Sequence, residues 1–176
     1  MTVEVIWDAS PLVHAHKVDR LDVLGDLARG SAENPWRNFT TAAVVEELAG
    51  HNGACPDWLQ TVHVDGIAEL SSLALWLDRV ATSTHSKGEA TVLAWADCHK
   101  AIAIVDDADA RRVAQSYGLE VHGLLWAVAA AINCGRWTAA GSSAFVDQLL
   151  ASGARYPFES GGFEAWASKQ GLLGQS

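Results

Sequence analysis

Five acidic side chains at separate points of the chain are of the type that binds hard metal ions or transfers protons. Asp8 follows the expected strand at residues 3–7, which is apolar except for Glu4, and the adjacent Asp106 and Asp107 follow the apolar residues 101–105. Glu47 and Glu89 lie in two segments whose apolar residues recur with helical spacing. Carboxylate oxygens favour Mg²⁺ or Mn²⁺ over zinc, and crowded acids raise one another's pKa unless a cation neutralises them. If these acids converge, they predict a site for metal-assisted hydrolysis.

The elements that carry these acids favour convergence. The apolar runs at 3–7 and 101–105 are typical of buried parallel strands, whose carboxyl ends border the ligand crevice of an open α/β sheet. On the helix expected at 42–49, Glu47 lies near the edge of the apolar stripe, whereas Glu46 lies almost opposite it. On the helix expected at 88–99, Glu89 lies on the same face as the apolar residues at 92, 93 and 96. We therefore expect Glu47 and Glu89 to face inward.

The remaining pattern alternates strands with helices and predicts an α/β fold with a parallel sheet. Further strands are expected at 39–41, 61–65 and 119–122, with a polar loop at 31–38. Further helices are expected at 12–27 with a break near Asp19, and at 70–80, 108–117, 124–133, 143–150 and 163–169.

The composition indicates one globular domain. The chain has 176 residues, of which 49% are hydrophobic and 19% are charged. No apolar stretch is long enough to span a bilayer and no leader is recognised at the start, so a cytoplasmic protein without membrane contact is expected. Three widely spaced cysteines do not suggest a zinc or redox site. The net charge of −9 excludes binding of nucleic acid through the overall field.

Each acid also has a structural interpretation that the residues leave open. Asp8 could form an Asx-turn, and Asp109 could cap the helix at 108–117. Glu89 could close a capping box with Ser86. The site hypothesis therefore depends on the whole set of acids rather than on any one of them.

Three cations are candidates for contacts to substrate phosphates. Arg111 and Arg112 follow the acids within one helical turn, and Lys87 directly precedes the turn that contains Glu89. Solvated helix charge is the alternative for all three. Of the eight tryptophans, Trp36 and Trp58 fall in expected loops and are candidates for stacking on bases.

The ordered set of motifs resembles that of PIN-domain proteins, and its nearest branch is the bacterial one related to the VapC toxins. The motifs are WDASPL at 7–12, VVEEL at 44–48, GEA at 88–90, IVDD at 104–107 and ARR at 110–112. The resemblance covers about residues 3 to 137. It implies a three-layer α/β/α sandwich at 1–137 with a mostly parallel sheet, and a helical extension at 138–176 packed on it.

The resemblance also implies an activity, namely Mg²⁺- or Mn²⁺-dependent endoribonuclease cleavage by the acids Asp8, Glu47, Glu89 and Asp107. Asp8 and Asp107 would bind the metal, with Glu89 and Asp106 completing the site. RNA would be the substrate, and the protein could be the toxin of a toxin–antitoxin pair, so an antitoxin and a second copy of the chain are the expected protein partners. The alternatives are a PIN-like binding or regulatory module with little activity, and a nuclease acting on DNA. Many toxins have aspartate where this chain has Glu89, and the tail is longer than in a minimal toxin.

Overall fold

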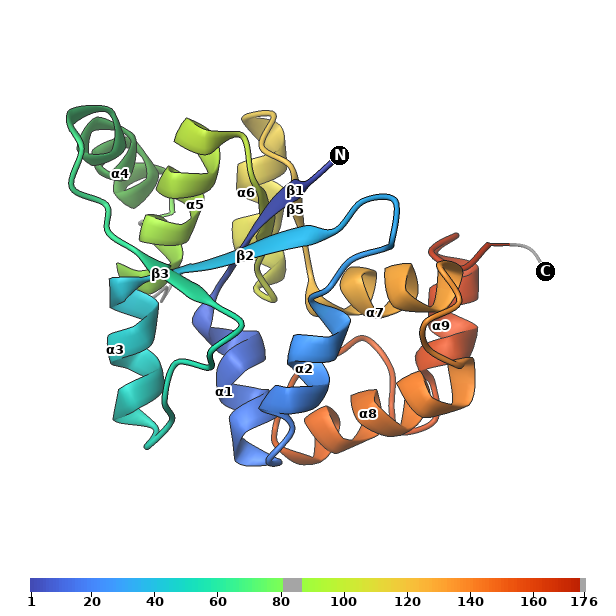
Figure 1. Cartoon of the computed structure of the whole chain (residues 1–176). Coiled ribbons are helices and arrows are strands. Elements are labelled where there is room, and N and C mark those ends of the chain that lie inside the picture. The colour runs from blue at the N-terminus through green and yellow to red at the C-terminus, as the bar shows by residue number, and fades with distance from the viewer. Residues whose placement is uncertain (81–86, 175–176) are drawn as a thin grey trace.

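The central feature of the fold is a five-stranded parallel sheet (Figure 1). The computed structural model describes residues 1–80 and 87–174. The strand order is β3-β2-β1-β4-β5, with β1 at Val3–Trp7, β2 at Trp36–Thr41, β3 at Gln60–Val62, β4 at Ile102–Ile104 and β5 at Val121–His122. Helices flank this sheet, which confirms the predicted α/β/α sandwich with a parallel sheet.

The middle strand is buried on both faces, as its apolar sequence predicts. Val5, Ile6 and Trp7 are fully buried, because helices cover both sides of a parallel sheet. Trp7 pairs with Ile104 of β4, and the Asp8 amide donates to the Ile104 carbonyl at 3.0 Å. The residues that follow β1 and β4 therefore start from neighbouring points of one sheet edge.

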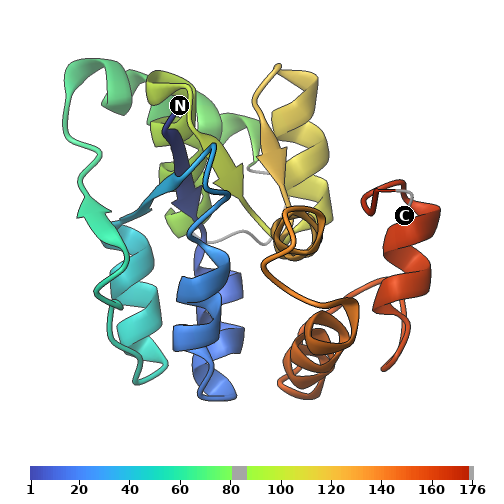
Figure 2. The ribbon, with the colours of Figure 1, turned by 45° about the vertical axis from the view of Figure 1, so that its right-hand side comes forward.

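The described helices are α1 at Ala9–Lys17, α2 at Leu21–Leu27, α3 at Ala42–Gly50, α4 at Ile67–Arg79, α5 at Lys87–His99, α6 at Ala108–Ser116, α7 at Leu124–Asn133, α8 at Ala139–Ala151 and α9 at Phe163–Lys169. Helix α5 packs on β1, β2 and β4, while α3 packs on β2 and β3. Figure 2 shows α8 and α9 on the side of the molecule away from α3 and α4. No helix in the described part of the chain has the length and apolar character needed to cross a bilayer.

Most expected elements are present, but the predicted loop at 31–38 is wrong at its end. Strand β2 begins at Trp36, which pairs with Val3. The Trp36 ring stacks on Trp126, with centroids 5.7 Å apart and an interplanar angle of 3°. Pairing with the central strand and stacking on α7 thus override the polar character of the preceding residues.

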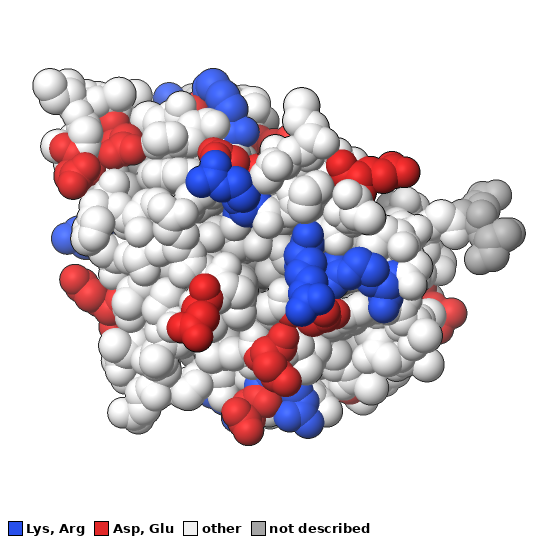
Figure 3. Space-filling view, in the orientation of Figure 1, with Lys and Arg blue, Asp and Glu red and all other residues white. Residues whose placement is uncertain are grey.

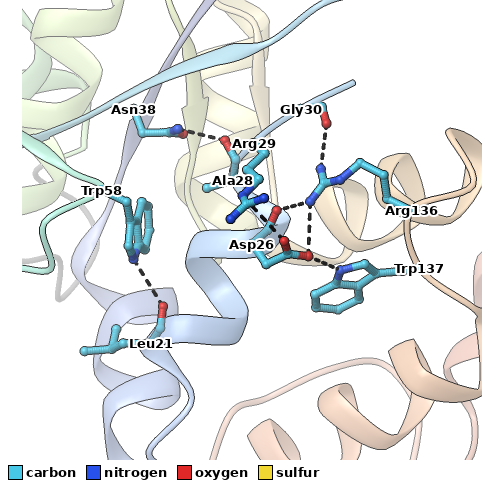
Figure 4. A network of polar contacts seen from close by, with 9 residues as sticks. All are labelled: Leu21, Asp26, Ala28, Arg29, Gly30, Asn38, Trp58, Arg136 and Trp137. Atoms are coloured by element: carbon cyan, nitrogen blue, oxygen red, sulfur yellow. Dashed lines mark hydrogen bonds and ion pairs between the residues drawn. The ribbon is translucent and has the colours of Figure 1, made fainter. Parts of the chain in front are cut away.

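Trp58 also packs within the protein. Its ring meets that of Trp7 edge-on at 5.7 Å, and its Nε1 donates to the Leu21 carbonyl at 3.1 Å (Figure 4). Packing against strands or helices therefore accounts for both tryptophans that were candidates for base stacking.

A polar network ties the start of the C-terminal extension to α2 (Figure 4). Asp26 accepts hydrogen bonds from Trp137 Nε1 at 2.8 Å and from Arg136 Nη2 at 3.2 Å. Arg136 Nη1 also donates to the Gly30 carbonyl at 2.6 Å. The Trp137 hydrogen bond is the largest contribution that lowers the pKa of Asp26 below its usual value. The extension thus starts from a point fixed by residues more than a hundred positions earlier in the chain.

Candidate active site

Asp8 occupies the turn between β1 and α1. It stands at the N-cap position of α1, yet its side chain makes no capping hydrogen bond. The side chain is 5% exposed, and its Oδ1 has no hydrogen-bond partner among the described residues. A buried carboxylate oxygen without a donor is costly unless it is protonated or bound by a cation. The Ala9 and Ser10 amides also act on this carboxyl and lower its pKa against the larger effect of burial, so a local turn contact and a place in the site coexist at Asp8.

Glu89 lies in the first turn of α5, on the face that packs on the sheet. It is 3% exposed, and Val92, Leu93 and Ala96 on the same face are fully buried. The inward orientation predicted from helical spacing is therefore what the structure has. The capping-box alternative needs Ser86, which lies outside the described residues.

Glu47 of α3 is half-buried, whereas its neighbour Glu46 is exposed. Helix α3 starts at the end of β2, where the Thr41 hydroxyl accepts from the Val44 amide at 3.3 Å. Because β2 neighbours β1 in the sheet, this connection brings α3 to the edge where Asp8 lies.

Asp107 caps α6. Its Oδ1 accepts from the Ala110 amide at 2.8 Å, as an N-cap carboxylate does. The alternative that Asp109 is the cap is wrong: Asp109 is the second residue of the helix and pairs with Arg112 at 2.8 Å at an exposed position. The capping bond fixes the position of the Asp107 carboxyl relative to the end of β4.

Asp106 connects the end of β4 to the start of α7. Its Oδ1 accepts from the Leu124 amide at 2.8 Å. The Arg111 guanidinium lies beside it and lowers its pKa, but burial outweighs this and raises the pKa overall. Asp106 therefore has a structural partner as well as a place in the site.

All five acids line one cavity of about 380 Å³, which we call the acidic cavity. The other residues of its wall are Ser10, His14, Gly153, Ala154 and Arg155. The strand ends contribute Asp8, Asp106 and Asp107, and the helices contribute Glu47 and Glu89. Sequence positions almost a hundred residues apart thus meet at one place.

Burial and the charges of neighbouring acids raise the pKa values of Asp8 and Glu89 in this cavity. Burial is the main cause that raises the pKa of Asp8 to about 7, and the charges of Glu47 and Asp106 add to it. Burial likewise raises the pKa of Glu89 to about 8, with additions from Asp8, Asp107 and Glu47. Each acid therefore disfavours ionisation of the others, as expected for carboxylates without a neutralising charge.

The donor set fits a hard divalent cation. Five carboxylates, one of them with a buried and unpartnered oxygen, offer the oxygen ligands that Mg²⁺ and Mn²⁺ prefer. A cation would also relieve the repulsion that raises the pKa values of Asp8 and Glu89. Over residues 1–80 and 87–174, however, no three His, Cys, Asp or Glu side chains form a ready-made cluster. The acids line the cavity as separate groups.

Sequence reasoning missed the remaining residues of the wall. Ser10 and His14 are four residues apart on α1 and so share a helix face, which is a signal that the sequence does contain. His14 Nδ1 lies 2.8 Å from the Ser152 hydroxyl at the end of α8. Residues 153–155 close the cavity from the C-terminal extension, and no local pattern in the sequence indicates this.

The three candidate cations are not equivalent. Arg111 donates to the Val105 carbonyl at 2.8 Å and lies next to Asp106 at the site. Arg112 points to the exposed Asp109, and neither Arg112 nor Lys87 lines the acidic cavity. The cation at the cavity wall is instead Arg155, which is exposed.

Comparison with known families places the acidic cavity within a described domain family. A family model described as a PIN domain matches residues 4–160. The match covers all the acids of the cavity and runs past Trp137 into the extension, as far as the segment that carries Arg155. No curated protein matches the chain.

Proposed function

The chain belongs to the PIN-domain family, whose members are generally nucleases, and from that premise we propose that it is a metal-dependent endoribonuclease. The observation that carries the proposal is the acidic cavity, where five acids from separate parts of the chain meet and two have pKa values raised to about 7 and 8. Metal-assisted hydrolysis uses carboxylates brought together in this way.

In this proposal Asp8, Glu89 and Asp107 hold the cation, and Glu47 and Asp106 contribute negative charge around it. When bound, the divalent cation neutralises these acids, orients the scissile phosphate and lowers the pKa of the attacking water. Asp8 and Glu89 release their protons as the site fills, because ligand carboxylates must be ionised. The hydrogen bonds from the Leu124 and Ala110 amides keep the carboxyls of Asp106 and Asp107 in place. These two side chains therefore need little movement when the cation binds.

Because the net charge of the chain is −9, RNA must be held by local contacts with individual cations. Figure 3 shows that, on the face presented there, basic side chains gather in small groups among acidic and uncharged residues, without a broad basic area. Arg155 at the wall of the acidic cavity and Arg111 beside Asp106 are the cations placed to contact substrate phosphates. Arg112 and Lys87 are not part of the proposal.

Cleavage of RNA by the purified full chain tests the proposal. Single-stranded RNA and DNA of the same mixed sequence are incubated with the protein in millimolar Mn²⁺, in millimolar Mg²⁺ and in EDTA. We expect RNA fragments with either metal and none in EDTA. Intact RNA under all three conditions contradicts the proposal, and cleavage of DNA alone replaces it with a DNA nuclease.

One observation favours a second candidate, a PIN-like binding module with little activity. Asp106 and Asp107 both serve as hydrogen-bond acceptors for helix starts, so part of the acidic set has a structural role. If that role is the only one, millimolar Mn²⁺ leaves the melting temperature unchanged, because a ligand stabilises a protein only by binding its native state.

A toxin role is a further part of the proposal, and the possible antitoxin and homodimer partners belong to it. Growth of cells after induced expression separates this role from nuclease activity itself. Wild-type protein is expected to slow growth, and a variant without nuclease activity is not. Unimpaired growth with an active enzyme removes the toxin role and leaves the nuclease.

A further inference from the structure

A second cavity opens beside the acidic cavity. It has a volume of about 590 Å³, and its wall is made by α6, by the start of α7 and by the C-terminal extension. We call it the aromatic cavity, because Trp126, Tyr156 and Trp166 are part of its wall. Asp106 and Arg155 line both cavities, so the two spaces adjoin at these residues.

We propose that the aromatic cavity binds a nucleobase of the RNA next to the phosphate held at the acidic cavity. This inference rests on the proposed nuclease function, since it assigns a subsite to the same substrate. Its volume is in the range of small-molecule sites, which are mostly apolar with a few polar groups that fix orientation.

The apolar part of the wall suits the faces and edges of a base. Val121 and Leu125 add aliphatic surface to the aromatic rings. Trp126 is held between His122, with centroids 4.1 Å apart, and Trp36, with centroids 5.7 Å apart. Its ring is therefore fixed in orientation and offers an edge rather than a face. The Trp166 ring packs against the Phe158 ring, with centroids 5.3 Å apart, and Trp166 is half-buried.

The polar part of the wall suits the hydrogen-bonding edge of a base and the adjoining phosphate. Gln115 and Gln170 carry side-chain amides that can both donate and accept. Gln115 Nε2 already donates to the Val121 carbonyl at 3.2 Å, so its Oε1 and the second hydrogen of Nε2 are left for a base. Arg111 and Arg155 lie on the side shared with or next to the acidic cavity, where a phosphate would be. The Tyr156 hydroxyl is buried and faces the Asp106 carboxyl, whose charge raises the pKa of Tyr156 in addition to the larger effect of burial. The arginines lie beside the acids, where the phosphate would bind, and the amides lie outside the acidic cavity, where the base would bind. This arrangement follows the order of phosphate and base in a nucleotide.

Another cavity of the molecule lacks these features. A space of about 710 Å³ between the 30–36 segment and α7 is lined largely by apolar residues and shares no residue with the acidic cavity. Its arginine, Arg136, is engaged with Asp26 and the Gly30 carbonyl. Of these two cavities, the aromatic cavity is therefore the better candidate for binding a base, because it adjoins the acids and has polar groups in its wall.

The extension builds this subsite. Tyr156, Trp166 and Gln170 all follow the expected boundary at residue 137. A tail longer than that of a minimal toxin thus has a role in substrate recognition, because without it one side of the aromatic cavity would be absent.

Nuclear magnetic resonance of the tryptophan indole groups tests the inference without any need for cleavage. The full chain, labelled with ¹⁵N and kept in EDTA, is titrated separately with AMP, GMP, CMP, UMP and inorganic phosphate. We expect the Trp166 indole resonance to shift to saturation with at least one nucleotide. The resonances of Trp58 and Trp137 are internal controls, because their Nε1 groups are bonded to Leu21 and Asp26 outside the cavity.

Two variants give the expected size of the effect. Trp166→Leu lacks the Trp166 indole, so binding to this variant is followed through the indole resonance of Trp126, which lines the same cavity. The substitution should weaken binding of the preferred nucleotide about tenfold, as loss of a base–aromatic contact does. Because Trp166 also packs on Phe158, the milder Gln115→Ala at an exposed position of α6 is made as well, and it should change the order of preference among the four nucleotides. Gln60→Ala, an exposed glutamine on β3, is the matched control and should leave binding unchanged.

The outcomes separate this inference from the nuclease proposal. Nucleotide binding without RNA cleavage supports the subsite and contradicts the nuclease. RNA cleavage with no shift of Trp166 by any nucleotide contradicts the subsite and leaves the nuclease. Equal shifts with inorganic phosphate and with nucleotides, or equal binding by wild type and both variants, also overturn the inference, because then no base is recognised.

Discussion

Replacing Asp8 by asparagine is expected to reduce RNA cleavage roughly 100-fold or more, since loss of one charged ligand removes several kcal/mol of stabilisation and about 1.4 kcal/mol corresponds to a factor of ten. Asparagine keeps the shape of the side chain but cannot supply the negative charge that a divalent cation requires. The same substitution removes a buried carboxylate whose Oδ1 has no partner among the described residues. The folded protein should therefore be as stable as wild type or more so.

Loss of activity with retained stability distinguishes a functional residue from a structural one. Initial cleavage rates and melting temperatures in EDTA are measured for both proteins. Asp109→Asn is the matched control, because it removes the same charge from a nearby exposed position that pairs with Arg112. It should cleave at nearly the wild-type rate. Wild-type activity of Asp8→Asn would remove Asp8 from the site.

The stability of the metal-free chain is expected to fall as the pH rises from about 5 to 8. Burial raises the pKa of Asp8 from 3.8 to about 7 and that of Glu89 from 4.5 to about 8. Between the unfolded and folded values the native state binds more protons than the unfolded state, so the free energy of unfolding decreases with pH. One pKa unit corresponds to about 1.4 kcal/mol, and because the two carboxyls titrate as a coupled pair, we expect a total loss of several kcal/mol across this range.

Urea unfolding in EDTA at several pH values measures this effect. The pKa values of His14 and His122 are lowered mainly by burial, which gives an opposite slope at the acidic end. The comparison with Asp8→Asn isolates the contribution of Asp8. The variant keeps the buried Glu89 and should still lose stability toward pH 8, but less steeply than the wild type. Mn²⁺ should restore more stability at pH 8 than at pH 6, since protons compete with the cation. Equal pH dependence in wild type and variant would contradict the electrostatic account.

Apolar runs and the helical spacing of apolar residues predicted the sheet and most of the helices, because the positions of apolar residues show which side chains are buried. The run before Asp8 lies in the central strand, and the inward position of Glu89 follows from one helical face. The prediction for Trp36 failed because its strand pairing depends on β1, which is distant in sequence. The alternative that Asp109 caps the helix at 108–117 was wrong, because Asp107 two residues earlier satisfies the same capping pattern and is the residue that caps α6.

The wall of the acidic cavity was predictable only in part. Five acids were found because their types and placement suit one chemistry. The contact of His14 with Ser152 joins residues 138 positions apart, and it depends on how the extension folds back over α1. No periodicity within α1 or α8 contains that information. Arg155 was missed for the same reason, because its place at the cavity is set by the connection between α8 and α9.

The position of a bound Mn²⁺ ion tests the central claim most directly, namely that these acids form a metal site. A crystal of the full chain is soaked in Mn²⁺ and measured at a wavelength where manganese scatters anomalously. The account predicts an anomalous peak in the acidic cavity, ligated by carboxylates of Asp8, Glu89 and Asp107. A well-diffracting soaked crystal with no peak in that cavity, or with peaks at other sites alone, would contradict it.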